Sequence, residues 1–198
     1  MYQWRQLTEE DRAALLSWRQ HLKRPWHSPP HFATGPGCFH LTAACYDHAE
    51  IIGHSVKRMQ DFSEDLIRTL DQVGATLHAW CLLPNHYHLL LDVPDLKKTT
   101  SSLGLLHGRT SFAWNGEEGQ RGRKVWCAPS DREIRGEAHF WATLNYIHHN
   151  PVKHGWVTHW QHWPYSSAAE YLASVGREEA VRLWKSYPVL DYGSGWDD

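Results

Sequence analysis

The sequence contains neither a long hydrophobic run nor a strong excess of acidic or basic residues. No apolar stretch approaches the roughly 18 residues that a membrane-spanning helix needs. Residues 1–20 also lack the apolar segment of a signal peptide. We therefore expect a folded cytoplasmic protein that has no membrane partner.

Cysteine and glycine patterns exclude further classes of protein. The four cysteines show no C-x-x-C spacing, so we expect neither a zinc knuckle nor a disulfide framework from Cys38, Cys45, Cys81 and Cys127. Walker-type and dinucleotide-binding glycine loops are also absent, which predicts a protein without a nucleotide cofactor.

The net charge of −2 argues against a general coat of basic residues for binding nucleic acid. The distribution is uneven, because residues 97–135 carry eight bases against four acids. A local basic surface and an ordinary solvated face both explain this excess. A basic surface that positions phosphates would draw on Arg109, Arg123, Lys124 and Lys153.

The chain has enough apolar residues for one folded domain with extensions, since 41% of its 198 residues are hydrophobic and 12 are Trp. A Pro- and Gly-rich stretch at 27–37 separates the beginning of the chain from its main body. We therefore predict an N-terminal segment and arm, a main domain and a C-terminal helical extension with a tail, over residues 1–37, 38–160 and 161–198.

Hydrophobic periodicity predicts the elements of the main domain. Alternation indicates a strand over residues 38–46, and residues 75–83 and 86–93 are expected to form the next two strands, with shorter strands over 122–128 and 131–136. Helical spacing indicates helices over residues 59–73, 95–116 and 137–150. The last helix is expected to end at Asn150, because Pro151 disfavours helix in the residue before it. This order predicts an α+β fold, an antiparallel sheet with helices packed on it.

Two histidines, His86 and His88, lie one residue apart in the apolar strand "HYHLLLDV". Both side chains leave the same face of the strand, because the period of a strand is two residues. With 16 histidines in the chain, about one His-x-His is expected by chance. The pair therefore indicates a metal site only if other ligands join it.

Tyr146 and Asn150 are candidates for that site, because their i, i+4 spacing places them on one face of the predicted helix. Each also has a structural interpretation, Tyr146 as a core aromatic residue and Asn150 as a cap of the helix end. Two imidazoles and an amide oxygen from His86, His88 and Asn150 form a ligand set that suits Mg²⁺ or Mn²⁺.

A tyrosine beside such an ion predicts a particular chemistry. The phenol has a pKa near 10 and is a weak nucleophile in water, but a metal-polarised phosphorus is open to its attack. The product is a phosphotyrosine, which a 3′-hydroxyl attacks in reverse to rejoin a strand. This pattern favours cutting and rejoining of DNA over simple hydrolysis.

The segments "LLPNHYHLLL" and "NYIHHNPVKHGWV" resemble those of the REP-associated tyrosine transposases, members of the single-tyrosine HUH transposase superfamily. The HUH motif, two histidines around a hydrophobic residue, corresponds to residues 86–88. Its middle residue here is Tyr87, which lies on the opposite strand face and is not the expected nucleophile. The resemblance places the nucleophile at Tyr146 and the amide metal ligand at Asn150.

The resemblance also implies a fold and a substrate. The fold is a ferredoxin-like sheet, similar to RNA-recognition modules, within residues 38–160, with the HUH motif on a central strand. The substrate is single-stranded DNA that carries hairpins of repetitive extragenic palindromes (REP), cut near a short guide tetranucleotide. The oligomeric state stays open.

Two other functions remain open from the sequence. A zinc hydrolase would use His86 and His88, with His78 of the neighbouring strand as a third ligand and water as the nucleophile. A protein without catalysis would only hold folded nucleic acid, for which 13% aromatic residues supply stacking surfaces.

Overall fold

The computed structural model describes residues 35–189, together with residues 8, 10, 14 and 17. Its sheet is antiparallel, with strand order β2-β3-β1-β4. The strands are β1 (Gly37–Ala44), β2 (Thr76–Leu82), β3 (His86–Val93) and β4 (Ser130–Glu133). The predicted α+β class is confirmed, and β3 is an inner strand of the sheet.

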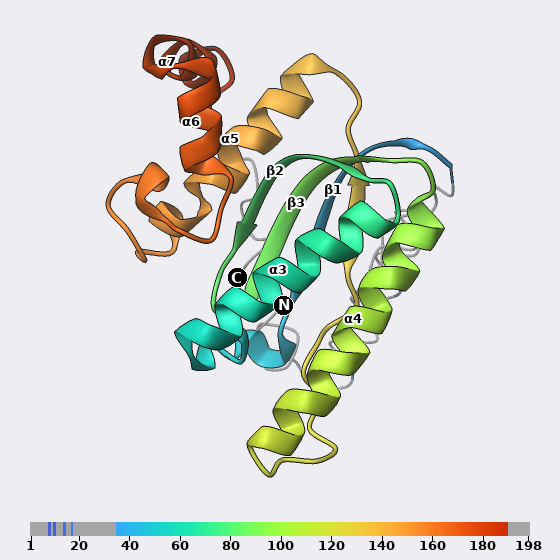
Figure 1. The fold of residues 1–198 in the computed structure, drawn as a ribbon. Coiled ribbons are helices and arrows are strands. Elements are labelled where there is room, and N and C mark those ends of the chain that lie inside the picture. The colour runs from blue at the N-terminus through green and yellow to red at the C-terminus, as the bar shows by residue number, and fades with distance from the viewer. Residues whose placement is uncertain (1–7, 9, 11–13, 15–16, 18–34, 190–198) are drawn as a thin grey trace.

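Helices cover both faces of this sheet (Figure 1). Two lie side by side across one face, α3 (Val56–Gln72) and α4 (Leu96–Glu117). A third, α5 (Glu137–Lys153), packs against β2 and β3 from the other side, and α6 (Ala168–Val175) and α7 (Arg177–Ser186) continue from it. Short 3-10 helices occur at Tyr46–His48, Ile52–His54 and Trp160–His162.

Side-chain caps fix where the two neighbouring helices begin. Ser55 accepts a hydrogen bond from the backbone N–H of Arg58, and Asp95 accepts one from Lys98. Each cap satisfies an amide that has no partner within its helix. Helix α3 closes at Gly74, whose φ of +74° suits a residue without a Cβ atom.

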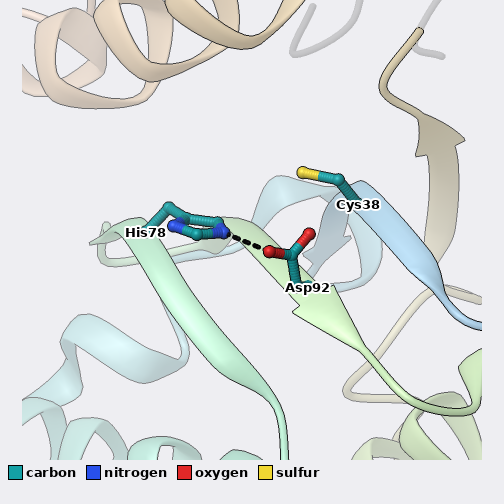
Figure 2. A group of neighbouring side chains, drawn as sticks. All are labelled: Cys38, His78 and Asp92. Carbon is teal, nitrogen blue, oxygen red and sulfur yellow. Dashed lines mark hydrogen bonds and ion pairs between the residues drawn. The ribbon is translucent and has the colours of Figure 1, made fainter. Parts of the chain in front are cut away.

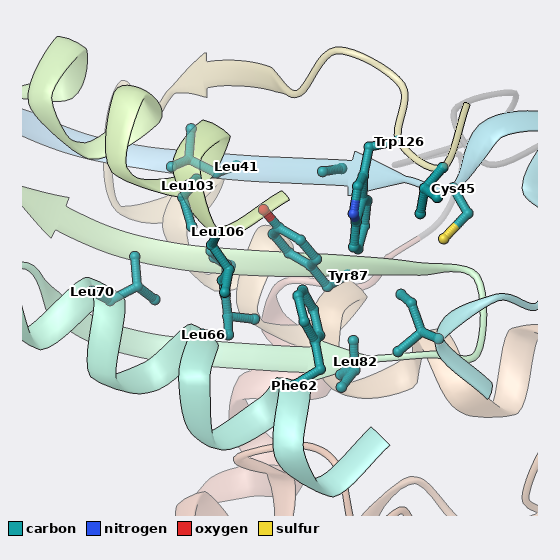
Figure 3. Close-up of a cluster of buried hydrophobic side chains, with 14 of the residues drawn as sticks. Leu41, Cys45, Phe62, Leu66, Leu70, Leu82, Tyr87, Leu103, Leu106 and Trp126 are labelled. Carbon is teal, nitrogen blue, oxygen red and sulfur yellow. The ribbon is translucent and has the colours of Figure 1, made fainter. Parts of the chain in front are cut away.

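The main hydrophobic core lies between the sheet and the pair α3 and α4 (Figure 3). Tyr87 is fully buried in it, and its hydroxyl group lies 3.0 Å from Nε2 of His107. The His107 ring stacks on Trp126 at 4.1 Å, and burial lowers the pKa of His107 to about 4. His107 is therefore neutral at pH 7, and Tyr87 has a packing role on this face.

A second core lies between the sheet and α5. It includes Leu90 of β3 and Leu144, Tyr146 and Ile147 of α5. This face is less apolar, because His40, His86, His88 and Asn150 are buried close to the same core. The two sides of one sheet thus have different chemical characters.

The structure corrects two expectations about local structure. Helix α5 does not end at Asn150 but continues through Pro151 to Lys153. Proline lacks one helical N–H, but later bonds, such as His154 N–H to the Asn150 carbonyl, hold the last turn. Residues 122–128 form no regular strand and contribute only an isolated bridge between Trp126 and Cys45.

The two outer parts of the predicted domain division are described only in part. Most of the N-terminal segment 1–37 and the end of the C-terminal tail, residues 190–198, lie outside the described residues. The boundary at 160/161 stays a prediction. Among the described helices, none is long and apolar enough to cross a membrane.

Candidate active site

Strand β3 directs the two histidines of the HUH motif toward α5. His86 and His88 expose 2% and 0% of their surfaces, and their ring centroids lie 5.0 Å apart. Tyr87 between them belongs to the opposite core, as the alternation of the strand predicts. The same-face placement of the two imidazoles is therefore confirmed.

The ring of His86 is fixed on both sides by amide side chains. Its Nδ1 lies 2.7 Å from Oδ1 of Asn85, and the Nδ2 group of Asn85 donates to the carbonyl of His48 at 3.0 Å. On the other side, its Nε2 lies 3.1 Å from Oδ1 of Asn150 on α5. Strand β3 and helix α5, far apart in sequence, therefore meet at this atom pair.

This arrangement fits a bound cation. Because Asn85 uses its amide N–H group elsewhere, its Oδ1 accepts the Nδ1 proton of His86. Nε2 of His86 and Oδ1 of Asn150 are then the two atoms that face each other, at 3.1 Å. Two ligand atoms of one cation lie at about this separation, since each metal–ligand bond is roughly 2.1 Å long. The Nδ2 group of Asn150 is buried with no hydrogen-bond partner among the described residues, so no hydrogen bond fixes this amide against ligation.

His88 is held through its other ring nitrogen by a residue that the sequence analysis missed. Nε2 of His40, on β1, lies 3.2 Å from Nδ1 of His88. A histidine ligand is commonly oriented through its second nitrogen in this way, and the first nitrogen then faces the metal. The alternation of Phe39 and Leu41 predicts that His40 lies on the opposite face of β1, but only the register with β3 brings it to His88.

Tyr146 lies against the same histidines. Its ring contacts His88 edge-on at a centroid distance of 5.2 Å and His40 at 5.9 Å. The ammonium group of Lys153 lies 5.4 Å from the centre of the Tyr146 ring. Tyr146, Asn150 and Lys153 follow one another at helical spacing, so α5 presents all three on one side.

Other histidines near the motif have different positions. His154 follows α5, four residues after Asn150, and its ring lies 5.1 Å from that of His86. His148 instead points away from the site, bonds the hydroxyl of Ser167 at 2.9 Å and stacks over Trp160. Burial lowers the pKa of His148 to about 3, so it packs as a neutral residue.

The four basic residues predicted to contact phosphates do not form one patch. Lys153 is beside Tyr146, whereas Lys124 lies over the ring of Tyr46, at the end of the sheet where β3 begins. Arg123 is engaged within the protein, with Glu118 at 2.8 Å and Asn115 at 2.9 Å. Arg109 belongs to α4, on the opposite side of the sheet.

The third zinc ligand considered from the sequence, His78, lies elsewhere. Its Nε2 is 2.7 Å from the carboxylate of Asp92. Asp92 lies six residues after His86 on β3, about 20 Å away by the rise of a strand. Cys38 is close to both residues (Figure 2). Burial first, and then the charge of Asp92, raises the pKa of Cys38 to about 12, so this thiol is not a ready nucleophile at neutral pH.

Comparisons with known proteins agree with this picture, although no family model matches the chain. A Haemophilus influenzae protein assigned by name to the REP-associated tyrosine transposases is 31% identical over an alignment of 149 residues, which covers 68% of this chain and 81% of that protein. The REP-associated tyrosine transposase of Escherichia coli is 29% identical over an alignment of 103 residues, which covers 46% of this chain and 53% of that protein.

A solved structure supports the fold. The structure of a REP-associated tyrosine transposase bound to a REP hairpin superimposes with a TM-score of 0.56 at 20% identity, over 70% of this chain and 81% of that one. The resemblance noted in the sequence is thus confirmed by relatives and by architecture. Given the match to most of the Haemophilus protein, the chain belongs to the REP-associated tyrosine transposases.

Proposed function

We propose that this transposase cuts and rejoins single-stranded DNA bearing REP-type hairpins, with Tyr146 as the nucleophile and a 5′-phosphotyrosine as the intermediate. The REP hairpin bound to the structural relative supports the choice of substrate. The names of the two sequence relatives point to the same class of DNA.

One observation carries the proposal. His86 of β3 and Asn150 of α5 approach within 3.1 Å, one helical turn from Tyr146. The structural interpretations of Tyr146 and Asn150 explain each residue separately. They do not explain why both lie against the same two buried histidines.

His86, His88 and Asn150 would hold the cation, which we propose to be Mg²⁺ or Mn²⁺. When bound, the cation neutralises charge on the phosphodiester and polarises its phosphorus. The protein contributes the orientation of the ligands, since Asn85 fixes the His86 ring and His40 fixes the His88 ring.

Tyr146 supplies the nucleophile. Its phenolic oxygen forms a bond to phosphorus while the bond from phosphorus to the 3′ oxygen breaks. The phenol loses its proton and the departing oxygen gains one, which leaves a free 3′-hydroxyl. Only 1% of the Tyr146 surface is exposed, so the side chains around it must move when DNA binds.

A denaturing gel with 5′- and 3′-labelled hairpin DNA tests this mechanism. The protein should form a covalent adduct with the 5′ end of the cut strand in Mg²⁺ or Mn²⁺. Tyr146→Phe keeps the ring and its packing but removes the attacking oxygen, so hairpin binding should survive and the adduct should vanish.

Tyr87→Phe is the matched control, because it removes a hydroxyl on the other face of the same sheet. We expect this variant to form the adduct. An adduct that persists in Tyr146→Phe would refute the nucleophile. Cleavage by the unmodified protein without any adduct would instead favour hydrolysis by a metal-activated water.

A further inference from the structure

Three strands bring potential metal ligands together at the end of the sheet opposite His86. Cys38 of β1, His78 of β2 and Asp92 of β3 have ligand atoms that all lie within 4.8 Å of one another (Figure 2). Cys38 and Asp92 are direct partners in the antiparallel register, which places both side chains on the face that α5 covers.

A β-bulge brings His78 to this cluster. Leu77 pairs with Leu91 and Ala79 pairs with Leu90, so His78 is an extra residue without a register partner in β3. The extra residue lets both His78 and Ala79 face α5, and the His78 ring bonds Asp92 at 2.7 Å. Bulges commonly redirect a side chain toward a functional site.

We propose that Cys38, His78 and Asp92 bind a zinc ion, separate from the cation at the HUH motif. A thiolate, an imidazole and a carboxylate are the three ligand types that zinc accepts, whereas Mg²⁺ and Mn²⁺ prefer oxygen ligands and imidazole to sulfur. Zinc–ligand bonds of about 2.0 to 2.3 Å require ligand atoms roughly 3 to 4 Å apart. The ligand atoms of Cys38, His78 and Asp92, all within 4.8 Å of one another, lie close to this requirement.

The surroundings leave room for a fourth ligand. The side chain of Asp92 is 54% exposed and that of His78 is 28% exposed, so water has access to the cluster. Three protein ligands and one water complete the tetrahedral geometry that zinc prefers.

The ion would join β1, β2 and β3 where α5 begins. The His78 ring packs edge-on against Phe140, in the first turns of α5, at a centroid distance of 5.2 Å. Asp92 is four residues from His88, about 13 Å along the strand, so the zinc ion and the cation at the HUH motif share no ligands. The role of the zinc ion is to hold the three strands together beside the first turns of α5.

Cobalt substitution tests the site without DNA or catalysis. The full chain, stripped with a chelator, should bind Co²⁺ and develop the near-ultraviolet charge-transfer band of a thiolate–cobalt bond. Zn²⁺ should then abolish this band by displacement. Cys38→Ser should lose the band, whereas Cys127→Ser, at another half-buried cysteine, should keep it.

Two further variants keep the test decisive. Asp92→Asn, at an exposed position, should preserve the far-ultraviolet circular dichroism. It should weaken cobalt binding by at least roughly 10–100-fold, which is the loss seen when a residue that only orients a metal ligand is removed. His86→Ala should keep the band, because it alters only the other site. A protein without the band, or a band that persists in Cys38→Ser, would mean that His78 and Asp92 form only an ion pair.

Discussion

Odd-numbered residues of β3 pack beneath α3 and α4, whereas even-numbered residues lie beneath α5. The odd set is Tyr87, Leu89, Leu91 and Val93, and the even set is His86, His88, Leu90 and Asp92. Strand β1 repeats this division, with Phe39 and Leu41 on the first side and Cys38 and His40 on the second. One apolar strand thus serves a core on one face and two polar clusters on the other.

This difference teaches that burial alone does not identify the role of a residue here. Tyr87 and Tyr146 are both at most 1% exposed. Burial raises the pKa of Tyr87 well above its usual range, and its hydroxyl faces the neutral His107. Tyr146 instead lies against His88 and His40, close to the Asn150 amide. The face of the sheet, more than the exposure, separates a packing tyrosine from a proposed nucleophile.

The largest expected effect comes from the polar face. His86→Ala removes a proposed ligand, and the covalent adduct should fall by at least about 100-fold on the labelled-hairpin gel, because a first ligand matters at least as much as its outer partners. His54→Ala, at an exposed histidine outside the site, should form the adduct normally. Normal adduct formation by His86→Ala would show that this residue does not hold the cation.

The apolar face should respond in the opposite way. Leu66→Ala opens a cavity at a fully buried position beneath α3, and it should lower the free energy of unfolding by about 2 to 5 kcal/mol in urea titrations. Its neighbour Ile67 is 40% exposed, and Ile67→Ala should change stability by no more than roughly 0.5 kcal/mol. The folded fraction of Leu66→Ala should still form the adduct. A loss of adduct greater than the unfolded fraction would show that the apolar face also contributes to the reaction.

The smallest expected effect concerns DNA binding. Lys153→Ala should lower the slope of log affinity against log salt by about one unit, because each true phosphate contact releases about one counterion. The same measurement on Arg109, Arg123 and Lys124 should give the smallest change for Arg109, which lies on the α4 side. Unchanged slopes in all four variants would rule out the predicted phosphate contacts.

Much of the sheet and its helices is readable from the sequence. The two-residue period of strands β1 and β3 predicts which side chains share a face, and the spacing from Met59 to Leu70 predicts the buried side of α3. Pro151 is different. Its local preference opposes a helix at this point, yet α5 continues through it, and both Asn150 and Pro151 are buried. Tertiary packing decides such conflicts, and no local pattern reports it.

The candidate site is only partly readable in the same way. Its histidine pair and the Tyr146–Asn150 spacing are local patterns, so the sequence suffices to name them. His40 and His78 join their clusters through strand pairing and through a bulge, which depend on register between distant segments. The ion pair of Arg123 with Glu118 likewise follows from the fold. Charge density along the sequence therefore does not distinguish Arg123 from the other three basic residues.

Helix α5 carries Tyr146 and Asn150 on one rigid segment, and Asn150 meets His86 of β3 across the interface between helix and sheet. The cation proposed to bind Asn150 and His86 would stabilise the docked position of α5, to the extent that it binds this position more tightly than a displaced one. By reciprocity, any ligand that favours a displaced α5 would weaken the affinity for the cation by the same factor. The placement of Tyr146 and the occupancy of the proposed cation site would therefore be thermodynamically linked.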